Sequence, residues 1–248
     1  MKFSLSILLL YIALQGSSQT ITHHNNIWFH YVGKNMISKK TSFTLEATMR
    51  FANGFEQAQQ FFIRPSIDYQ VSKPLTLSVG YTYYNTYSYG AMPLNKTSIP
   101  EHHIWIQVNY KHNLGDFTIT HRLRNENRLV GMPIAQGADY VMDYFEYRNR
   151  IRYMLMINHP ILRKNNKTIV NGILADEAFF NVGSFSGAGV MNQNRVIAGL
   201  AYIINPHHQI QFAYVHQNVW NKANTIEEIN PTLRMSYLTN LDFTKKKK

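Results

Sequence analysis

Residues 116–160 read DFTITHRLRNENRLVGMPIAQGADYVMDYFEYRNRIRYMLMINHP and contain two long segments of alternating character. In each segment most residues of one alternate set are aliphatic or aromatic, and most residues of the other set are Arg or Glu. Successive side chains of a β-strand point to opposite faces, so one face is apolar and the other ionic. The ionic set comprises Arg122, Arg124, Glu126, Arg128, Glu146, Arg148, Arg150 and Arg152.

Gly131, Pro133 and Gly137 place the connection between these segments at about residues 130–141, because these residue types suit a turn. An antiparallel register about that loop sets Glu126 near Arg148, Arg128 near Glu146, and Arg124 near Arg150. A half-solvated soluble sheet is the ordinary alternative, but its strands usually hold about five or six residues. The longer Arg-rich alternation favours an ionic face enclosed with water and an apolar face turned to lipid.

The rest of the chain continues the pattern, and eleven alternating runs are recognisable. They lie at about 27–31, 43–51, 61–70, 75–83, 104–111, the two hairpin segments, 167–181, 195–204, 209–217 and 233–243. The polar faces of other runs carry Glu46, Arg50, Asp68 and Arg195. Glu177 lies in the 167–181 run, whose alternation is unclear. We expect these five residues to join the ionic set of the hairpin on one surface.

The connections alternate in length, which is typical of bacterial outer-membrane barrels. Short ones lie near 38–41, 72–74, 113–116, 162–167 and 205–208, and longer ones near 85–101, 130–141, 183–192 and 219–230. The sequence therefore predicts an all-β fold, an antiparallel up-and-down transmembrane β-barrel of 10–12 strands. Strands that start and end in the periplasm must be even in number. One run is thus expected to be miscounted, with the first and the eighth as the candidates.

The two ends of the chain indicate export. Residues 1–19 combine Lys2, a short apolar run and small residues at 16–18, which predicts a cleaved signal peptide too short to span a bilayer. Residues 20–248 then form a single outer-membrane β-barrel domain without cysteine. The alternate apolar residues that end at Phe243 resemble the signal read by the barrel-assembly machinery. The predicted location is the outer membrane of a Gram-negative bacterium, with membrane lipid and that machinery as partners.

Alternation alone does not decide which face lies inside, since a soluble lipocalin-like barrel has the same period with its apolar face inward. Three features favour the membrane alternative: the alternating loop lengths, the Arg-rich polar face and the apolar run that ends at Phe243. Tyr and Trp near strand ends are in addition candidates for interfacial girdles, because these residues collect at membrane interfaces. These girdle candidates are Trp28, Tyr83, Tyr87, Tyr110, Tyr147, Tyr153 and Trp220.

Little in the sequence points to chemistry. The formal charge is +11, from 25 Lys and Arg against 14 Asp and Glu, but the Arg residues lie on strands of an exported chain. Nucleic acid is therefore not an expected partner. The paired histidines, such as His102–His103, would point to opposite faces of a strand, so we expect no metal site and no cofactor. Ser88 and His103 are near enough to each other to be considered as a lipid-modifying pair, but nothing in the sequence supports activation of the serine, so we expect no enzyme.

Several motifs resemble an uncharacterised family of small bacterial outer-membrane barrels, domain of unknown function 2490. They are Trp28, Gly33, TSFTLEATMRF at 41–51, HRLRNENR at 121–128, EYRNRIRY at 146–153, DEAFFN at 176–181 and NQNRVIAGLAY at 192–202. The resemblance implies an outer-membrane β-barrel and no established chemistry.

The leading hypothesis is a porin-like barrel with an Arg/Glu-lined lumen, either structural or a narrow, anion-preferring passage. An outer-membrane lipid-modifying enzyme and a soluble lipocalin-like binding barrel are the alternatives.

Overall fold

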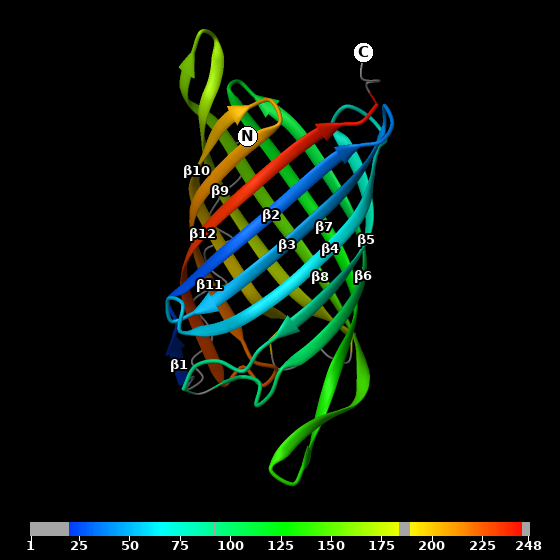
Figure 1. Cartoon of the computed structure of the whole chain (residues 1–248), viewed down its shortest axis with the longest axis vertical. Helices are drawn as coiled ribbons and strands as arrows, with labels where there is room; N and C mark the ends of the chain where they lie inside the picture. Colours follow the sequence, from blue (N-terminus) through cyan, green and yellow to red (C-terminus); the bar gives the residue numbers. More distant parts are fainter. Residues whose placement is uncertain (1–19, 92, 184–188, 245–248) are drawn as a thin grey trace, which may run out of the picture.

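Eleven strands close into one barrel in the computed structural model, which describes residues 20–91, 93–183 and 189–244 (Figure 1). The predicted signal peptide, residues 1–19, lies outside the described residues. The strands are β1 (Thr20–His23), β2 (Asn26–Met36), β3 (Thr41–Ala52), β4 (Gln57–Gln70), β5 (Leu75–Thr86), β6 (Ile99–Leu114), β7 (Phe117–Gln136), β8 (Asp139–Lys164), β9 (Lys167–Val182), β10 (Met191–Asn205), β11 (His208–Trp220) and β12 (Ile226–Asp242).

The prediction of an all-β barrel with 10–12 strands is confirmed, and each of the eleven alternating runs corresponds to one barrel strand, β2 to β12. The expectation of a miscounted run is wrong. It assumed antiparallel closure, whereas β12 pairs with β2 in parallel, from Thr232 opposite Asn26 to Asp242 opposite Met36. A parallel closing pair makes the strand number odd, while the pairs from β2–β3 to β11–β12 are antiparallel.

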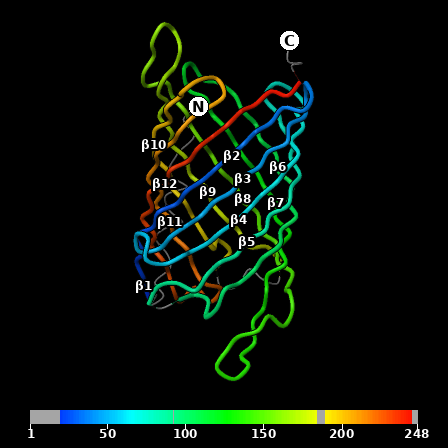
Figure 2. Tube along the Cα trace, viewed as in Figure 1, coloured from blue at the N-terminus to red at the C-terminus, as the bar shows by residue number. Residues whose placement is uncertain are grey.

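The barrel has two distinct ends (Figure 2). The turn end carries the connections 37–40, 71–74, 115–116, 165–166 and 206–207, together with the end of β12. The loop end carries the connections β3–β4, β5–β6, β7–β8, β9–β10 and β11–β12, as the strand bounds show. Short β1 also lies there, because it pairs in parallel with the start of β12, Thr20 opposite Ile226. The first described strand therefore begins at one mouth, and the last strand finishes at the other.

The β7–β8 hairpin differs from its prediction in turn and register. The strands continue past Gly131 and Pro133, with an irregularity between Met132 and Pro133, to a two-residue turn at 137–138 where Gly137 has φ 64°. Proline is tolerated in a strand at such a bulge. Glu126 lies opposite Arg150 and Arg128 opposite Arg148, so the pairing is shifted by two residues from the predicted one. The hairpin projects beyond the barrel at the loop end (Figure 1).

The apolar face of the sheet points outward. Large exposed hydrophobic side chains follow the outer face of every barrel strand, for example Ile104, Ile106 and Val108 on β6, whereas most of the inward Arg and Glu side chains are buried. This arrangement is the reverse of a lipocalin-like barrel. Trp28, a predicted girdle residue, is 3% exposed and faces the lumen. No part of the described chain forms a helix long and apolar enough to cross a membrane.

The charged side chains are unevenly distributed over the inner wall. Strands β7 and β8 present the most, whereas β5 presents only neutral residues such as Ser78 and Thr82. Strands β9 to β12 combine small or apolar residues with polar and charged ones, including Ala175, Ile197, Ala213, Val215, Glu177, Arg195 and Glu228. The unclear alternation of residues 167–181 follows from this, because β9 points Ile173, Ala175 and Phe179 inward beside Glu177.

Candidate functional site: the ionic lining of the lumen

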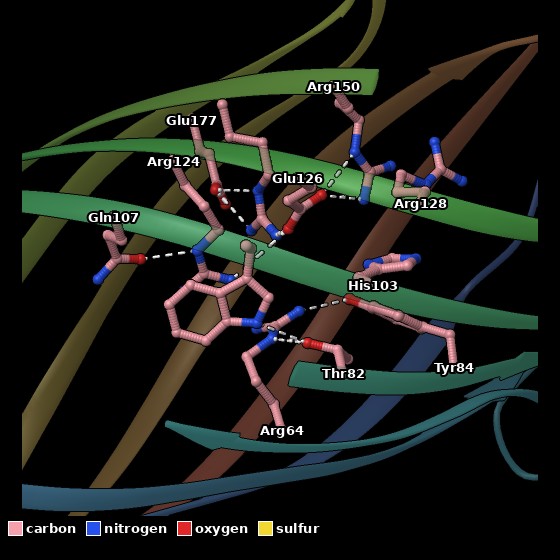
Figure 3. Close-up of polar contacts among 12 residues, drawn as sticks. Arg64, Thr82, Tyr84, His103, Gln107, Arg124, Glu126, Arg128, Arg150 and Glu177 are labelled. Carbon is pink, nitrogen blue, oxygen red and sulfur yellow. Dashed lines mark hydrogen bonds and ion pairs between the residues drawn. The ribbon is translucent and has the colours of Figure 1, made fainter. Parts of the chain in front are cut away.

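Glu126 is the centre of an ion-pair network across β7, β8 and β9 (Figure 3). Its side chain is fully buried. Arg150 donates to Glu126 Oε2 from Nε at 2.8 Å and Nη2 at 2.6 Å, and Arg152 Nη1 donates to Oε1 at 2.7 Å. Arg124 Nη1 lies 3.6 Å from Oε1. One carboxylate thus serves three guanidinium groups, which two neighbouring strands bring to it by strict alternation.

Glu177 on β9 extends the network. Its Oε1 accepts from Arg152 Nε at 2.9 Å, from Arg152 Nη2 at 2.6 Å and from Arg122 Nη2 at 2.6 Å. Its Oε2 lies 3.9 Å from Arg195 Nη1 on β10. Arg152 therefore bridges Glu126 and Glu177, and its planar guanidinium suits this two-sided contact.

Two further carboxylates of the inner wall, Glu101 and Glu46, each pair with an arginine and a histidine. Glu101 Oε2 accepts from Arg128 Nη2 at 2.6 Å and lies 2.9 Å from His103 Nε2. Glu46 has two partners, Arg64 Nη1 at 2.8 Å and His30 Nε2 at 3.1 Å. Arg64 also donates to the hydroxyls of Thr82 and Tyr84.

Aromatic rings hold several guanidinium planes in the lumen. The Arg124 guanidinium lies 4.2 Å from the Trp105 ring centroid, Arg152 lies 4.4 Å from Phe179, and Arg50 lies 4.0 Å from Trp28. Such contacts contribute on the order of 0.5–2 kcal/mol each. They also restrict the guanidinium orientation, so the arginines present fixed donor geometries to the lumen.

Gly80 makes room for one of these rings. It lies opposite Trp105 in the register, and a Cβ there would collide with the indole and lie 2.7 Å from the Pro65 carbonyl oxygen. In this position the indole donates a hydrogen bond from Nε1 to Thr82 Oγ1 at 3.0 Å, and its ring packs against the Arg124 guanidinium.

We expect Gly80→Ala to displace the Trp105 indole and to lower the free energy of unfolding by about 1–3 kcal/mol, the usual effect of overpacking. Denaturant titration in lipid vesicles measures this, and tryptophan fluorescence reports the displaced ring. Ser78→Ala on the same strand is the matched control, since the buried Ser78 hydroxyl makes no hydrogen bond. Equal stability of the two variants would contradict this role of Gly80.

The structure brings most of the residues proposed from the sequence into one lining. Glu46, Arg122, Arg124, Glu126, Arg128, Arg150, Arg152, Glu177 and Arg195 lie in the contacts given above. Arg148 pairs with Glu146 at 2.7 Å near the base of the projecting hairpin. Arg50 faces the lumen, where Gln60 accepts its Nη1 hydrogen bond. Asp68 lies apart near the turn end and accepts from Ser42 and Thr44 at 3.3 and 2.6 Å.

The ionic set proposed from the sequence omits several residues of this lining, among them Arg64, Glu101, His103, Glu228 and Arg234. His103, considered above only as one of a histidine pair and beside Ser88, is fully buried in the lumen. The alternation of Trp105, Gln107 and Asn109 on β6, extended two steps toward the amino end, would have placed His103 and Glu101 on the inner face. Among the residues described, no three His, Cys, Asp or Glu side chains form a potential metal site.

Comparisons with known proteins place the chain in a family. A solved structure described as the NanC porin aligns with 82% of this chain and 93% of its own, at 8% identity and a TM-score of 0.45. Outer-membrane expressed OmpT of Vibrio cholerae aligns with 77% of this chain and 56% of its own, at 12% identity and a TM-score of 0.36. A search of curated proteins gives no significant match. Residues 25–228 match the family model described as protein of unknown function (DUF2490), and the chain belongs to that family.

Proposed function

We propose that this protein spans the outer membrane of a Gram-negative bacterium and provides a narrow passage that prefers small anions. The apolar outer face supports the membrane location, because closed barrels satisfy all strand hydrogen bonds and can turn an apolar band to lipid. The short turns of the turn end then face the periplasm, and the longer connections and the β7–β8 hairpin face outward.

The charge of the inner wall carries the proposal of anion preference. Arginines outnumber carboxylates there: Arg50, Arg64, Arg122, Arg124, Arg128, Arg148, Arg150, Arg152, Arg195 and Arg234 stand against Glu46, Asp68, Glu101, Glu126, Glu146, Glu177 and Glu228. Arg50 and Arg234 have no carboxylate within 4.0 Å among the described residues. A low-dielectric wall with excess positive charge attracts anions and repels cations.

The strand number supports a narrow passage. About eight strands leave an interior that side chains just fill, and sixteen to eighteen leave an open aqueous channel. The eleven strands here lie near the lower limit, and long Arg side chains occupy part of the section. Small ions fit such a lumen better than large solutes.

Ion selectivity in planar lipid bilayers tests the proposal. We expect refolded protein to conduct, and its reversal potential under a tenfold KCl gradient to have the sign of chloride preference. Arg234→Gln should lower this preference, because it removes a lumen charge that no carboxylate within 4.0 Å balances. A cation preference would contradict the proposal, and folded protein that never conducts would instead indicate a structural barrel.

A further inference from the structure

A cavity of about 180 Å³ lies inside the barrel at the loop end, lined from strands on both sides of the lumen. Tyr87 and Tyr89, which follow β5, line part of it. Four arginines line it, Arg50, Arg128, Arg150 and Arg195. At about 30 Å³ per water molecule, its volume holds roughly six waters or one small organic molecule.

The four arginines fall into two classes. Arg128 and Arg150 are paired with Glu101 and Glu126 at 2.6 Å each. Arg50 has no carboxylate within 4.0 Å in the described chain, and its Nε is buried without a hydrogen-bond partner. Arg195 has only the long 3.9 Å contact to Glu177. Two guanidinium groups on the cavity wall therefore lack a close counterion.

Neutral groups hold these two guanidiniums in place. The Trp28 ring centroid lies 4.0 Å from Arg50 Cζ and 5.2 Å from Arg195 Cζ, and Phe179 lies 4.7 Å from Arg195 Cζ. The Gln60 amide oxygen accepts a hydrogen bond from Arg50. The Gln193 side-chain amide satisfies its hydrogen bonds when its oxygen faces Arg195, and that oxygen then accepts from Arg195 at 2.6 Å. Both cations are thus fixed near one indole, and no described carboxylate lies within 4.0 Å of Arg50.

This arrangement suits an organic carboxylate. A planar carboxylate accepts two parallel hydrogen bonds from a guanidinium, and such charge-assisted bonds are the strongest that a protein makes with an anion. Glu101, the one carboxylate on the cavity wall among the described residues, is already engaged by Arg128 and His103. The remaining wall is rich in amides and phenols, including Gln59, Gln217 and Tyr84, which hydrogen-bond hydroxyl groups.

We infer that this cavity binds small hydroxylated carboxylates, with the carboxylate held between Arg50 and Arg195. The inference rests on the proposed function in one respect, since the anion must enter the lumen from the loop end. It adds a saturable site to a passage that would otherwise select by charge alone.

Calorimetric titration of the refolded protein in detergent micelles tests the site with three probes. Gluconate carries a carboxylate and hydroxyls, glucose has the hydroxyls alone, and inorganic phosphate is an anion without them. We expect saturable binding of gluconate, weaker binding of phosphate and none of glucose. Because Trp28 lies against both guanidiniums, gluconate should also change the tryptophan fluorescence with the same midpoint.

Arg50→Gln should weaken gluconate binding at least about tenfold, as expected for the loss of a charge-assisted contact. Arg195→Gln is the second variant and should do the same. Arg234→Gln is the matched control, because it removes an inward arginine that does not line the cavity, and binding should stay within about twofold. The β-sheet circular dichroism spectrum identifies the folded variants.

The outcomes separate the site from the passage. Gluconate binding without conductance supports the binding site and contradicts the passage. Conductance without gluconate binding supports the passage and contradicts the binding site. Equal loss of binding in Arg50→Gln and Arg234→Gln would overturn the inference, because general lumen charge would then explain it. Tighter binding of phosphate than of gluconate would overturn the assigned ligand class.

Discussion

Replacing Glu126 with alanine should lower the free energy of unfolding by about 3–5 kcal/mol, the usual cost of removing one partner of a buried ion pair. The carboxylate is fully buried and serves Arg150 and Arg152 directly. Arg152 would retain Glu177, whereas Arg150 would lose both hydrogen bonds that it donates to Glu126. An uncompensated buried guanidinium accounts for most of the expected loss.

Reversible denaturant unfolding in lipid vesicles measures this change. Tyr147→Ala removes a larger but 60% exposed side chain on the outer face and should cost less. Glu146→Ala is the matched control, since the same exchange there breaks a partly exposed ion pair with Arg148 and should cost about 1 kcal/mol or less. If the Glu126 variant is no less stable than the Glu146 variant, the ion-pair network around Glu126 does not stabilise the barrel. In a conducting barrel, Glu126→Ala should also increase the preference for anions.

An arginine introduced at the centre of the outer face should lower the free energy of unfolding nearly as much as the loss of Glu126. We expect Ile106→Arg to lower the free energy of unfolding by roughly 2–4 kcal/mol in lipid, the effect of Arg at the bilayer midplane of a β-barrel. Ile106 is 61% exposed and lies between Ile104 and Val108 on the outer face of β6.

Leu114→Arg provides the control for depth. Leu114 ends the same strand at the turn end, points outward and is 67% exposed, so its environment in water would match that of Ile106. Near a membrane interface the arginine should cost only about 0–1 kcal/mol. Unfolding in vesicles measures both variants. Similar stability of the two would contradict a membrane-spanning outer face, because surface substitutions in water usually change stability by less than about 0.5 kcal/mol.

The period of two was sufficient to predict the strands and to group most of the ionic lining. Alternation depends only on backbone geometry, so Arg124, Glu126 and Arg150 could be assigned to one face without knowledge of their partners. The same rule omitted Glu101 and His103 only because the predicted run begins at residue 104, whereas β6 begins at Ile99.

Register and closure could not be predicted in this way. The register of a hairpin depends on its turn, and Gly131 and Pro133 suggested a loop where the strands in fact continue to Gly137. A shift of two residues keeps every side chain on its face, so the pattern was compatible with both pairings. The odd strand number depends on the parallel contact of β2 with β12, which joins distant segments and leaves no local signal.

The parallel seam also limits how the chain could be rearranged. Circular permutation usually succeeds because the termini of a domain lie close together. Here β1 begins at the loop end and β12, 17 residues long, finishes at the turn end. At about 3.3 Å per residue the gap is roughly 50 Å, so a joining linker would need at least about 15 residues. Such a linker would have to run through the lumen or along the outer wall of the barrel, so a short loop cannot join the two described ends of the sheet.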